Sequence, residues 1–293
     1  MDMLIPPKQS TQDKPLMRFE NICISYGGNG GGHAFGRAFG RKSKRSSADT
    51  LGREIIHDVS FSLKAGEILG LVGESGSGKS SLIRAALGLL GHRGTVSSGA
   101  IYYKGDNILD YSEAQLQGLR GAEIGMIFQD CASSLCPIRR IGTQVYESMR
   151  AHMKVSKVQA QEKALALFTR LGFKDPLSIW NSYPFELSGG MSQRVGIALS
   201  MLLEPSVLLA DEPTSALDVI VQEQVLEELK KLNEMFNTAI ILVSHDMALV
   251  AALADKILVL KDGRCMDYTT RQELFSSKSS SYTKELLAAL PRL

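Results

Sequence analysis

The segment GESGSGKS, residues 73–80, follows the apolar run of residues 67–72 and precedes a helix-forming stretch, residues 80–90. This order of strand, glycine-rich loop and helix matches the pattern G-x-x-x-x-G-K-[ST], which cradles the phosphates of a nucleoside triphosphate. A chance glycine-rich turn would rarely place a lysine and a serine in register after a strand. The segment therefore predicts a phosphate loop within an α/β fold.

Each residue type in this loop has a physical task. Glycine lets the backbone curl so that its N–H groups point at phosphate oxygens, and the following helix directs its positive end at the same place. Lys79 supplies positive charge near the β- and γ-phosphates, and Ser80 offers a hydroxyl ligand for Mg2+. The predicted nucleotide-binding residues of the loop are Gly73, Glu74, Ser75, Gly76, Ser77, Gly78, Lys79 and Ser80.

A second run, residues 207–211, has four apolar residues followed by an acid. A strand of this kind is buried on both faces and delivers its last residue to the carboxyl edge of a parallel sheet, where ligands bind. We expect Asp211 to hold Mg2+ through water. Glu212 comes next and points elsewhere, so it is predicted to act as a general base or to orient the attacking water.

The overall composition is that of an ordinary globular protein, with 293 residues, 44% hydrophobic and 22% charged. The formal charge of +2 gives no support for a nucleic-acid partner. The four scattered cysteines indicate a reducing compartment. No apolar run approaches the ~20 residues that span a bilayer, and the N-terminus lacks the pattern of a signal peptide. These features predict a cytosolic protein that reaches a membrane only through a partner.

The chain divides into segments of different character. Residues 1–15 are expected to be a flexible tail, and residues 16–26 a strand of an antiparallel sheet. Residues 27–54 are rich in glycine, serine and arginine, which predicts a flexible insertion. Residues 131–187 have helical patterning and are expected to form a helical subdomain inserted between strands of the core.

The sequence LSGGMSQR, residues 187–194, precedes the run VLLADEPTSALD, residues 207–218, by a short interval. Ser188 with Gly189 and Gly190 leaves a bare helix N-terminus, which suits a phosphate but also fits a plain helix cap. Together with the phosphate loop, this pair of motifs resembles the ATP-binding-cassette (ABC) ATPases. The resemblance implies that the LSGG motif of one subunit closes over the nucleotide of another.

The resemblance also implies roles for residues that the motifs alone do not identify. Gln129 resembles the residue that senses Mg2+ and the γ-phosphate, and His245 resembles the switch histidine that contacts the γ-phosphate. Tyr26 lies where the family has an aromatic residue that stacks on adenine. Asp218 has a helix-cap role and, in the family, a role in contacts across the dimer. The predicted catalytic residues are Glu212, His245 and Gln129, and the predicted metal-binding residues are Ser80, Gln129 and Asp211.

The fold that the resemblance implies is a P-loop NTPase (RecA-like) core with an antiparallel β subdomain and an inserted α-helical subdomain. It covers residues 16–293, including the insertion and the helical subdomain. The alternation of strands and helices independently favours a largely parallel sheet with helices on both faces.

Within the family the chain is most similar to ATPase subunits of peptide and nickel importers. The similarity rests on FQDCASSLCPIRRIGTQV, YPFELSGGMSQRV and YTKELLAALPRL. Ser192 stands where that subgroup usually has a basic residue, and Phe185 where histidine is common. Cys131 and Cys136 replace a frequent proline and asparagine in the loop that touches the permease, so an unusual partner is expected.

These features predict an ATP-hydrolysing subunit that powers uptake of peptides, nickel or a metal–metallophore complex, with ATP and Mg2+ as cofactors. The expected partners are an identical or homologous ATPase subunit, transmembrane permease subunits and, indirectly, an extracytoplasmic substrate-binding protein, without nucleic acid. The expected location is the cytoplasmic face of the inner membrane, as a peripheral subunit. The alternative is an ATPase component of a soluble carbon–phosphorus lyase complex, since relatives of peptide-importer ATPases work there without a permease.

Overall fold

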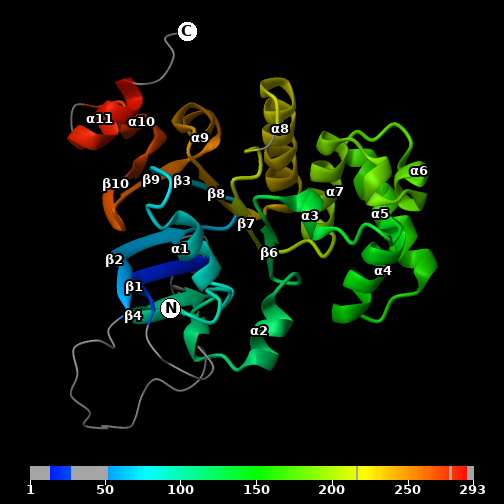
Figure 1. Cartoon of the computed structure of the whole chain (residues 1–293), viewed down its shortest axis with the longest axis horizontal. Coiled ribbons are helices and arrows are strands. Elements are labelled where there is room, and N and C mark those ends of the chain that lie inside the picture. Colours follow the sequence, from blue (N-terminus) through cyan, green and yellow to red (C-terminus); the bar gives the residue numbers. More distant parts are fainter. Residues whose placement is uncertain (1–13, 28–51, 216, 277–278, 289–293) are drawn as a thin grey trace, which may run out of the picture.

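The computed structural model describes residues 14–27, 52–215, 217–276 and 279–288. The predicted flexible tail and insertion fall mainly on residues 1–13 and 28–51, which lie outside the described residues. The described chain forms two β-sheets with helices around them and a separate group of helices at one end of the molecule (Figure 1).

The central sheet has six strands and is parallel apart from one antiparallel pair, β10 with β9. Its strands, in sheet order, are β10 (Arg264–Thr270), β9 (Lys256–Lys261), β3 (Ile68–Val72), β8 (Ala239–Ser244), β7 (Val207–Asp211) and β6 (Ile124–Ile127). Every residue of β3, β7 and β8 is buried. These continuous apolar runs form strands because helices cover both faces of the sheet.

The second sheet is antiparallel, as predicted for its first strand. Its order is β2 (Arg53–Leu63), β1 (Met17–Tyr26), β4 (Gly94–Tyr103) and β5 (Asp106–Asn107). Inward-facing side chains of this sheet share one core with helix α1 (Lys79–Ala85) and with one face of the central sheet. Phe19 and Phe61 stack in this core with ring centroids 4.2 Å apart. The phosphate-loop helix is therefore enclosed between two sheets.

A group of helices lies beyond β6, at the end of the molecule away from the antiparallel sheet (Figure 1). It contains α3 (Cys131–Ser134), α4 (Ile141–His152), α5 (Lys157–Arg170), α6 (Pro176–Asn181) and the short 3-10 turn η3 (Pro184–Glu186). Helix α5 begins with a capping box, in which the side chains of Ser156 and Gln159 each accept a hydrogen bond from the other residue's backbone N–H. We refer to these helices together as the helical layer.

The remaining helices cover the central sheet or join its strands. They are the 3-10 turn η2 (Ile108–Asp110) and helices α2 (Glu113–Leu119), α7 (Gly189–Met201), α8 (Val219–Phe236), α9 (Met247–Leu253), α10 (Arg271–Leu274) and α11 (Ser281–Ala288). Val225, Leu229 and Leu232 of α8 are buried and lie on one apolar face of the helix. Among the described residues, no helix combines the length and apolarity that crossing a membrane requires.

Two elements differ from the sequence prediction. Helix α1 is shorter than the predicted residues 80–90, because Gly88 adopts a φ of 64° and the chain turns there. The N–H of Leu89 bonds the carbonyl of Arg84, which is the closing bond of a Schellman motif. Strand β10 was not predicted, since its alternating half-buried pattern is weak beside the apolar core strands.

Candidate nucleotide-binding site

The predicted site residues come together at the carboxyl edge of the central sheet. Strands β3, β8, β7 and β6 run parallel, so their carboxyl ends lie at one edge. The phosphate loop follows β3, Asp211 ends β7, and His245 follows β8. Gln129 comes two residues after β6. Parallel pairing thus gathers residues that lie more than a hundred positions apart in the chain.

Two glycines of the phosphate loop are required by close contacts. Gly73 has a φ of 153°, and a Cβ there would lie 2.0 Å from the carbonyl oxygen of Leu260 in β9. Gly78 has a φ of 99°, and its Cβ would lie 2.4 Å from the side chain of Ile56 in β2. The loop is therefore packed against both sheets, and a side chain at either position would push it out of place.

Lys79 lies inside the curl of the loop. Its ammonium donates hydrogen bonds to the carbonyl oxygens of Gly73, at 2.7 Å, and Glu74, at 2.8 Å, and the side chain is 4% exposed. Burial lowers the pKa of Lys79 from its ordinary value. The charges of Glu212, Asp211 and Glu74 partly offset that effect and raise its pKa. The loop thus holds a buried cation where phosphate oxygens would approach.

Asp211 is fully buried, and each carboxylate oxygen accepts one hydrogen bond. The Ser80 hydroxyl donates to Oδ1 at 2.7 Å, and the Arg84 guanidinium donates to Oδ2 at 2.9 Å. Oxygen ligands of this kind fit Mg2+, which is usually held by one or two protein oxygens together with waters and substrate phosphates. The described residues contain no cluster of three or more His, Cys, Asp or Glu side chains able to hold a metal. The serine–aspartate pair is therefore the candidate Mg2+ position.

Glu212, Gln129 and His245 form a second polar group beside Asp211. The Gln129 amide donates to Glu212 Oε2 at 3.2 Å, and His245 Nδ1 lies 3.5 Å from the same oxygen. Glu212 has a φ of 47°, an unusual value for a residue with a side chain, and its N–H bonds the carbonyl of Val243. This backbone turn separates Glu212 from Asp211, as the sequence suggests. The geometry allows Glu212 to accept a proton from a water held near Gln129.

Tyr26 ends β1 on the other side of α1. Its hydroxyl lies 3.3 Å from Ser81 Oγ, and its ring packs against the backbone of Gly94. The ring is half-buried, so one part of it remains accessible. The adenine contact predicted for Tyr26 stays a prediction.

The LSGG motif begins helix α7, as predicted. Ser188 is the N-cap, and its hydroxyl accepts a hydrogen bond from the Met191 N–H at 3.3 Å. Ser188 and Gly189 are exposed, and a Cβ on Gly189 would meet nothing within 4 Å. No hydrogen bond recorded for the described residues joins this motif to the phosphate loop. The start of α7 is thus an open helix end within its own chain.

Asp218 caps the neighbouring helix α8, where its carboxylate accepts a hydrogen bond from the Val221 N–H at 3.0 Å. A Cβ on Gly190 would lie 3.1 Å from Val221, so the starts of α7 and α8 lie side by side. The structure therefore brings Ser188, Gly190 and Asp218 to one surface. Their contacts with a second subunit stay a prediction.

Two residues of the site were missed by the sequence reasoning. Arg84 contacts Asp211, and the signal for it was its position one helical turn after Ser80. Gln193, within the signature motif, donates to the carbonyl of Pro213 in the loop that follows Glu212. No sequence pattern identifies that contact, because it joins helix α7 to the loop after β7 through the packing of α7 on the sheet.

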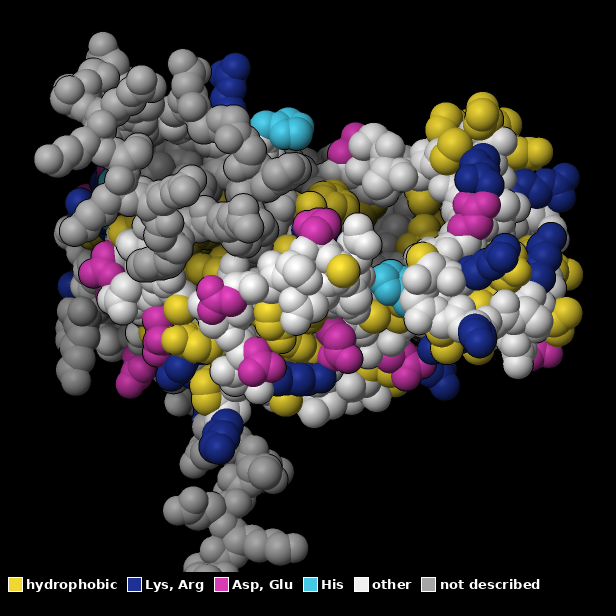
Figure 2. Space-filling model, turned by 90° about the horizontal axis from the view of Figure 1, so that it is seen from below, with side chains coloured by type: hydrophobic (Ala, Val, Ile, Leu, Met, Phe, Trp, Pro, Cys, Tyr) yellow, Lys and Arg dark blue, Asp and Glu magenta, His cyan; other side chains and the backbone are white. Residues whose placement is uncertain are grey.

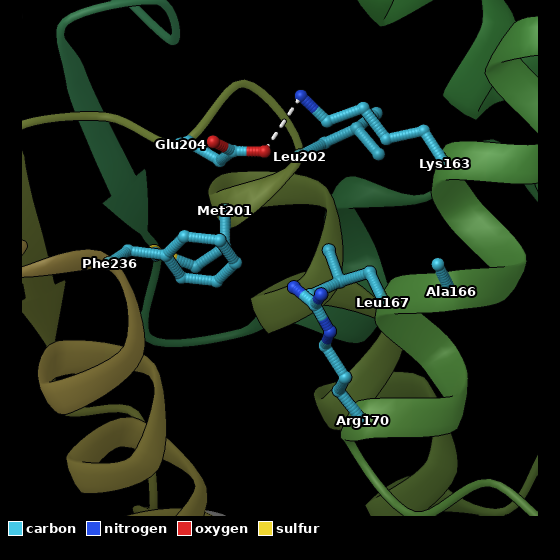
Figure 3. A pocket seen from close by; sticks show the side chains of 8 residues that line it. All are labelled: Lys163, Ala166, Leu167, Arg170, Met201, Leu202, Glu204 and Phe236. Carbon is cyan, nitrogen blue, oxygen red and sulfur yellow. Dashed lines mark ion pairs between the residues drawn. The ribbon is translucent and has the colours of Figure 1, made fainter.

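A cavity of about 380 Å³ lies away from these residues, between α5, the end of α7 and the end of α8 (Figure 3). Lys163 and Glu204 form an ion pair of 3.0 Å across it, and Phe236 and Met201 line it beneath. None of the predicted site residues lines this cavity. It is a gap between the helical layer and the core and does not belong to the nucleotide site.

The fold and this constellation define a P-loop ATPase. The sequence profile of a family described as ABC transporter matches residues 56–215. The oligopeptide transport ATP-binding protein OppD of Escherichia coli is 44% identical over 238 residues, which cover 81% of this chain and 70% of that protein. The dipeptide transport ATP-binding protein DppD of Bacillus subtilis is 39% identical over 82% of this chain and 72% of that protein. The chain belongs to the ABC transporter family.

Solved structures agree with this assignment. A dimeric ATP-binding cassette in a post-hydrolysis state with ADP and Pi matches 87% of this chain and 98% of its own, with a TM-score of 0.69 at 25% identity. The cbiO1 protein of Clostridium perfringens, part of an ABC transporter complex, matches 96% of this chain and 97% of its own, with a TM-score of 0.71 at 25% identity. The predicted family, fold class and ATPase activity are confirmed. The domain boundaries and the roles of individual residues stay predictions.

Proposed function

We propose that the chain is the ATP-hydrolysing subunit of a peptide importer and that each ATP site is shared between two subunits. The observation that carries the proposal is the contrast between two parts of the chain. The phosphate loop, Asp211 and Glu212 form a connected polar site, whereas the LSGG helix start is exposed and, among the described residues, has no hydrogen bond to that site. A second subunit would supply the missing side.

The residues of one chain divide the chemistry among them. The phosphate loop would bind and orient the triphosphate, with Lys79 neutralising charge. Ser80 and Asp211 would hold Mg2+, which would supply charge stabilisation on the phosphates. Glu212 accepts a proton from the attacking water or orients it, and Gln129 and His245 hold its carboxylate in place. Positioning and charge stabilisation supply most of the rate.

The partner for the shared site is an identical or homologous subunit. Its Ser188, Gly189 and Gly190 would add N–H donors of an open helix end to the γ-phosphate, and Asp218 would lie at the same interface. The matched ATP-binding cassette is dimeric in its solved post-hydrolysis state, which supports this arrangement.

The cargo and the membrane partners follow from the relatives. Those described above are oligopeptide and dipeptide transport proteins, which favours peptides, and the nickel and metallophore cargo stays a prediction. Transmembrane permease subunits would couple ATP-driven closure to transport, with a substrate-binding protein acting on the far side. The subunit would lie at the cytoplasmic face of the inner membrane.

Surface charge agrees with that location. Residues 139–174, in the helical layer, contain eight Lys or Arg and two Glu residues. Figure 2 shows Lys and Arg side chains gathered at the end of the molecule where the helical layer lies. A basic end favours a position near the anionic cytoplasmic leaflet or an acidic surface of a partner.

The same proposal gives the chain a domain plan. Residues 16–293 form one ABC unit that contains the insertion at 27–54 and the helical subdomain at 131–187. Contacts between α3 and α7 connect the helical subdomain to the signature helix, which supports treating them as parts of one unit.

A complementation experiment tests the shared site. Lys79→Met disables the phosphate loop and Ser188→Arg blocks the signature, so each variant alone should hydrolyse no ATP. A mixed dimer of the two variants contains one intact site, built from the loop of one and the signature of the other. Mixing equal amounts after reversible dissociation should restore roughly a quarter of the parent rate. If the mixture stays inactive while each variant still dimerises, the site is not shared.

Affinity purification from detergent-solubilised membranes tests the importer role. Recovery of permease chains with the tagged subunit is the expected result. Recovery of a soluble phosphonate-processing complex would contradict the importer and favour the carbon–phosphorus lyase alternative.

A further inference from the structure

The first turns of α1 place two donors on the same carboxylate. Ser80 and Arg84 are four residues apart, so they lie on one face of the helix. The Ser80 hydroxyl bonds Asp211 Oδ1 and the Arg84 guanidinium bonds Oδ2, at 2.7 and 2.9 Å. Asp211, the last residue of β7, is thus hydrogen-bonded by residues from two consecutive turns of the phosphate-loop helix.

Ser80 and Arg84 differ in whether they can keep their hydrogen bonds to Asp211 when Mg-ATP binds. Ser80 is the predicted metal ligand, so its oxygen would turn toward Mg2+ when Mg-ATP binds. Arg84 carries no lone pair and cannot bind a metal. Its bond to Oδ2 can therefore persist while the other oxygen of Asp211 faces the metal and its waters.

Asp211 needs such a fixed partner. Its side chain has no exposure to solvent, so water cannot compensate its charge. The nearby ammonium of Lys79 also interacts electrostatically with Asp211. Without Arg84 the carboxylate would be free to turn toward Lys79 and away from the metal position.

The contacts of Arg84 indicate that this is its dedicated task. Among the described residues, Asp211 is the side-chain hydrogen-bond partner recorded for Arg84, and its buried Nε has no partner. Arg120, which lies nearby at the end of α2, is used differently. It bonds the carbonyl of Leu87 and the carboxylate of Glu113, which ties α2 to the end of α1.

We propose that Arg84 is a positioning residue for Mg2+, which holds Asp211 by Oδ2 so that Oδ1 faces the metal. The inference rests on the proposed ATP site but concerns metal affinity and not transport or dimer formation. The bond is charge-assisted and directional, so both its charge and its geometry contribute. Outer partners of metal ligands typically change metal affinity by about 10- to 100-fold when removed.

The test compares metal-dependent and metal-free nucleotide binding in the full chain. Binding of a fluorescent ATP analogue is measured in EDTA and across a Mg2+ series for the parent and for Arg84→Met, Arg84→Lys and Arg120→Met. Retention of Mn2+ at saturating ADP is followed by electron paramagnetic resonance. Urea unfolding checks that each variant is folded.

Arg84→Met should raise the half-saturating Mg2+ and Mn2+ concentrations about 10-fold or more, with binding in EDTA unchanged. Arg84→Lys should give a smaller rise because the charge remains and the planar guanidinium is lost. Arg120→Met should behave as the parent in both conditions.

Two outcomes would overturn the inference. Unchanged metal affinity in folded Arg84→Met is one, and equal losses in EDTA and Mg2+ are the other, because they indicate general damage to the phosphate loop. If Arg84→Met does not fold, a parent-like metal affinity in Arg84→Lys overturns it in the same way. A parent chain that binds no ATP at all would instead contradict the proposed function.

Discussion

Two helix starts in this chain look alike in sequence and differ in structure. Helix α1 begins after Gly78 and α7 begins after Ser188, and glycines lie at both starts. At α1 Ser77 and Lys79 are buried, Lys79 is curled into the loop, and Ser80 bonds Asp211. At α7 the cap serine and the first glycine are exposed, and their bonds stay within the helix.

The difference supports the proposal that one chain builds only part of an ATP site. A bare helix end attracts an anion in either place, but the α1 end also has a cation, the proposed metal position and an acid beside it. The α7 end has none of these within bonding distance among the described contacts. A site that needs both ends therefore needs two chains.

The largest effect is expected at the complete half. Glu212→Gln removes the proposed proton acceptor while the amide keeps the contacts with Gln129 and His245. ATP binding should persist, and turnover should fall by about 100- to 10 000-fold. Steady-state hydrolysis and equilibrium binding of ATP measure the two quantities. Glu204→Gln, which removes an acid from a surface ion pair with Lys163, is the control and should keep the parent rate. Rapid hydrolysis by Glu212→Gln would remove Glu212 from the catalytic group.

A slightly smaller effect is expected at the open half. Ser188→Arg places a large side chain on the exposed start of α7, beside the open space at Gly189. Turnover should fall at least about 100-fold, because donors to the γ-phosphate are displaced, while binding at the chain's own phosphate loop stays intact.

The matched control for that variant is Ser156→Arg. Ser156 is also an exposed N-cap serine, at the start of α5. Its substitution removes a similar capping hydrogen bond at a place away from the site. It should hydrolyse ATP close to the parent rate. Equal losses of ATP hydrolysis in the two variants would mean that the lost helix cap, and not a shared site, explains the lower rate.

A moderate effect on stability is expected at the contact between α7 and α3, which connects the signature helix to the segment after Gln129. Gly196 of α7 faces Cys131 of α3, and a Cβ at Gly196 would lie 2.6 Å from the Cys131 Cβ. Gly196→Ala should lower the free energy of unfolding by about 1–3 kcal/mol, because α3 must move away from α7. Urea unfolding measures the change. Gly118→Ala, in α2 with open space around it, should instead be neutral or slightly stabilising.

The smallest effect is a difference in the alkylation of two cysteines of the parent chain, one of which, Cys131, packs against Gly196 of α7. Burial raises the pKa of the Cys131 thiol to about 11, so the thiolate fraction at pH 8 is roughly one in a thousand. Alkylation should reach the half-buried Cys136 first, and labelling of Cys131 should increase as the pH approaches 11. Mass spectrometry of peptides after timed labelling measures both sites. Equal labelling at pH 8 would show that α3 and α7 separate readily.

The sequence predicted the elements of the site better than its contacts. The phosphate loop, the strand ending at Asp211 and the caps at Ser188 and Asp218 are encoded in local spacing, because strand, turn and cap preferences act over a few residues. Arg84 and Gln193 were not predicted. Their partners, Asp211 and the Pro213 carbonyl, are 127 and 20 positions away, and only packing of α1 and α7 on the sheet brings them together.

The sequence by itself determined that this chain is an α/β ATPase of the ABC type, because glycines, Lys79 and the acid pair stand in fixed local order. Tertiary structure decided what those residues face. Parallel pairing of β3, β7 and β8 brought Asp211 to Ser80 and Arg84, and exposure left Ser188 open. Local preferences act along the chain, whereas the burial of a carboxylate or the openness of a helix end depends on which elements pack around it.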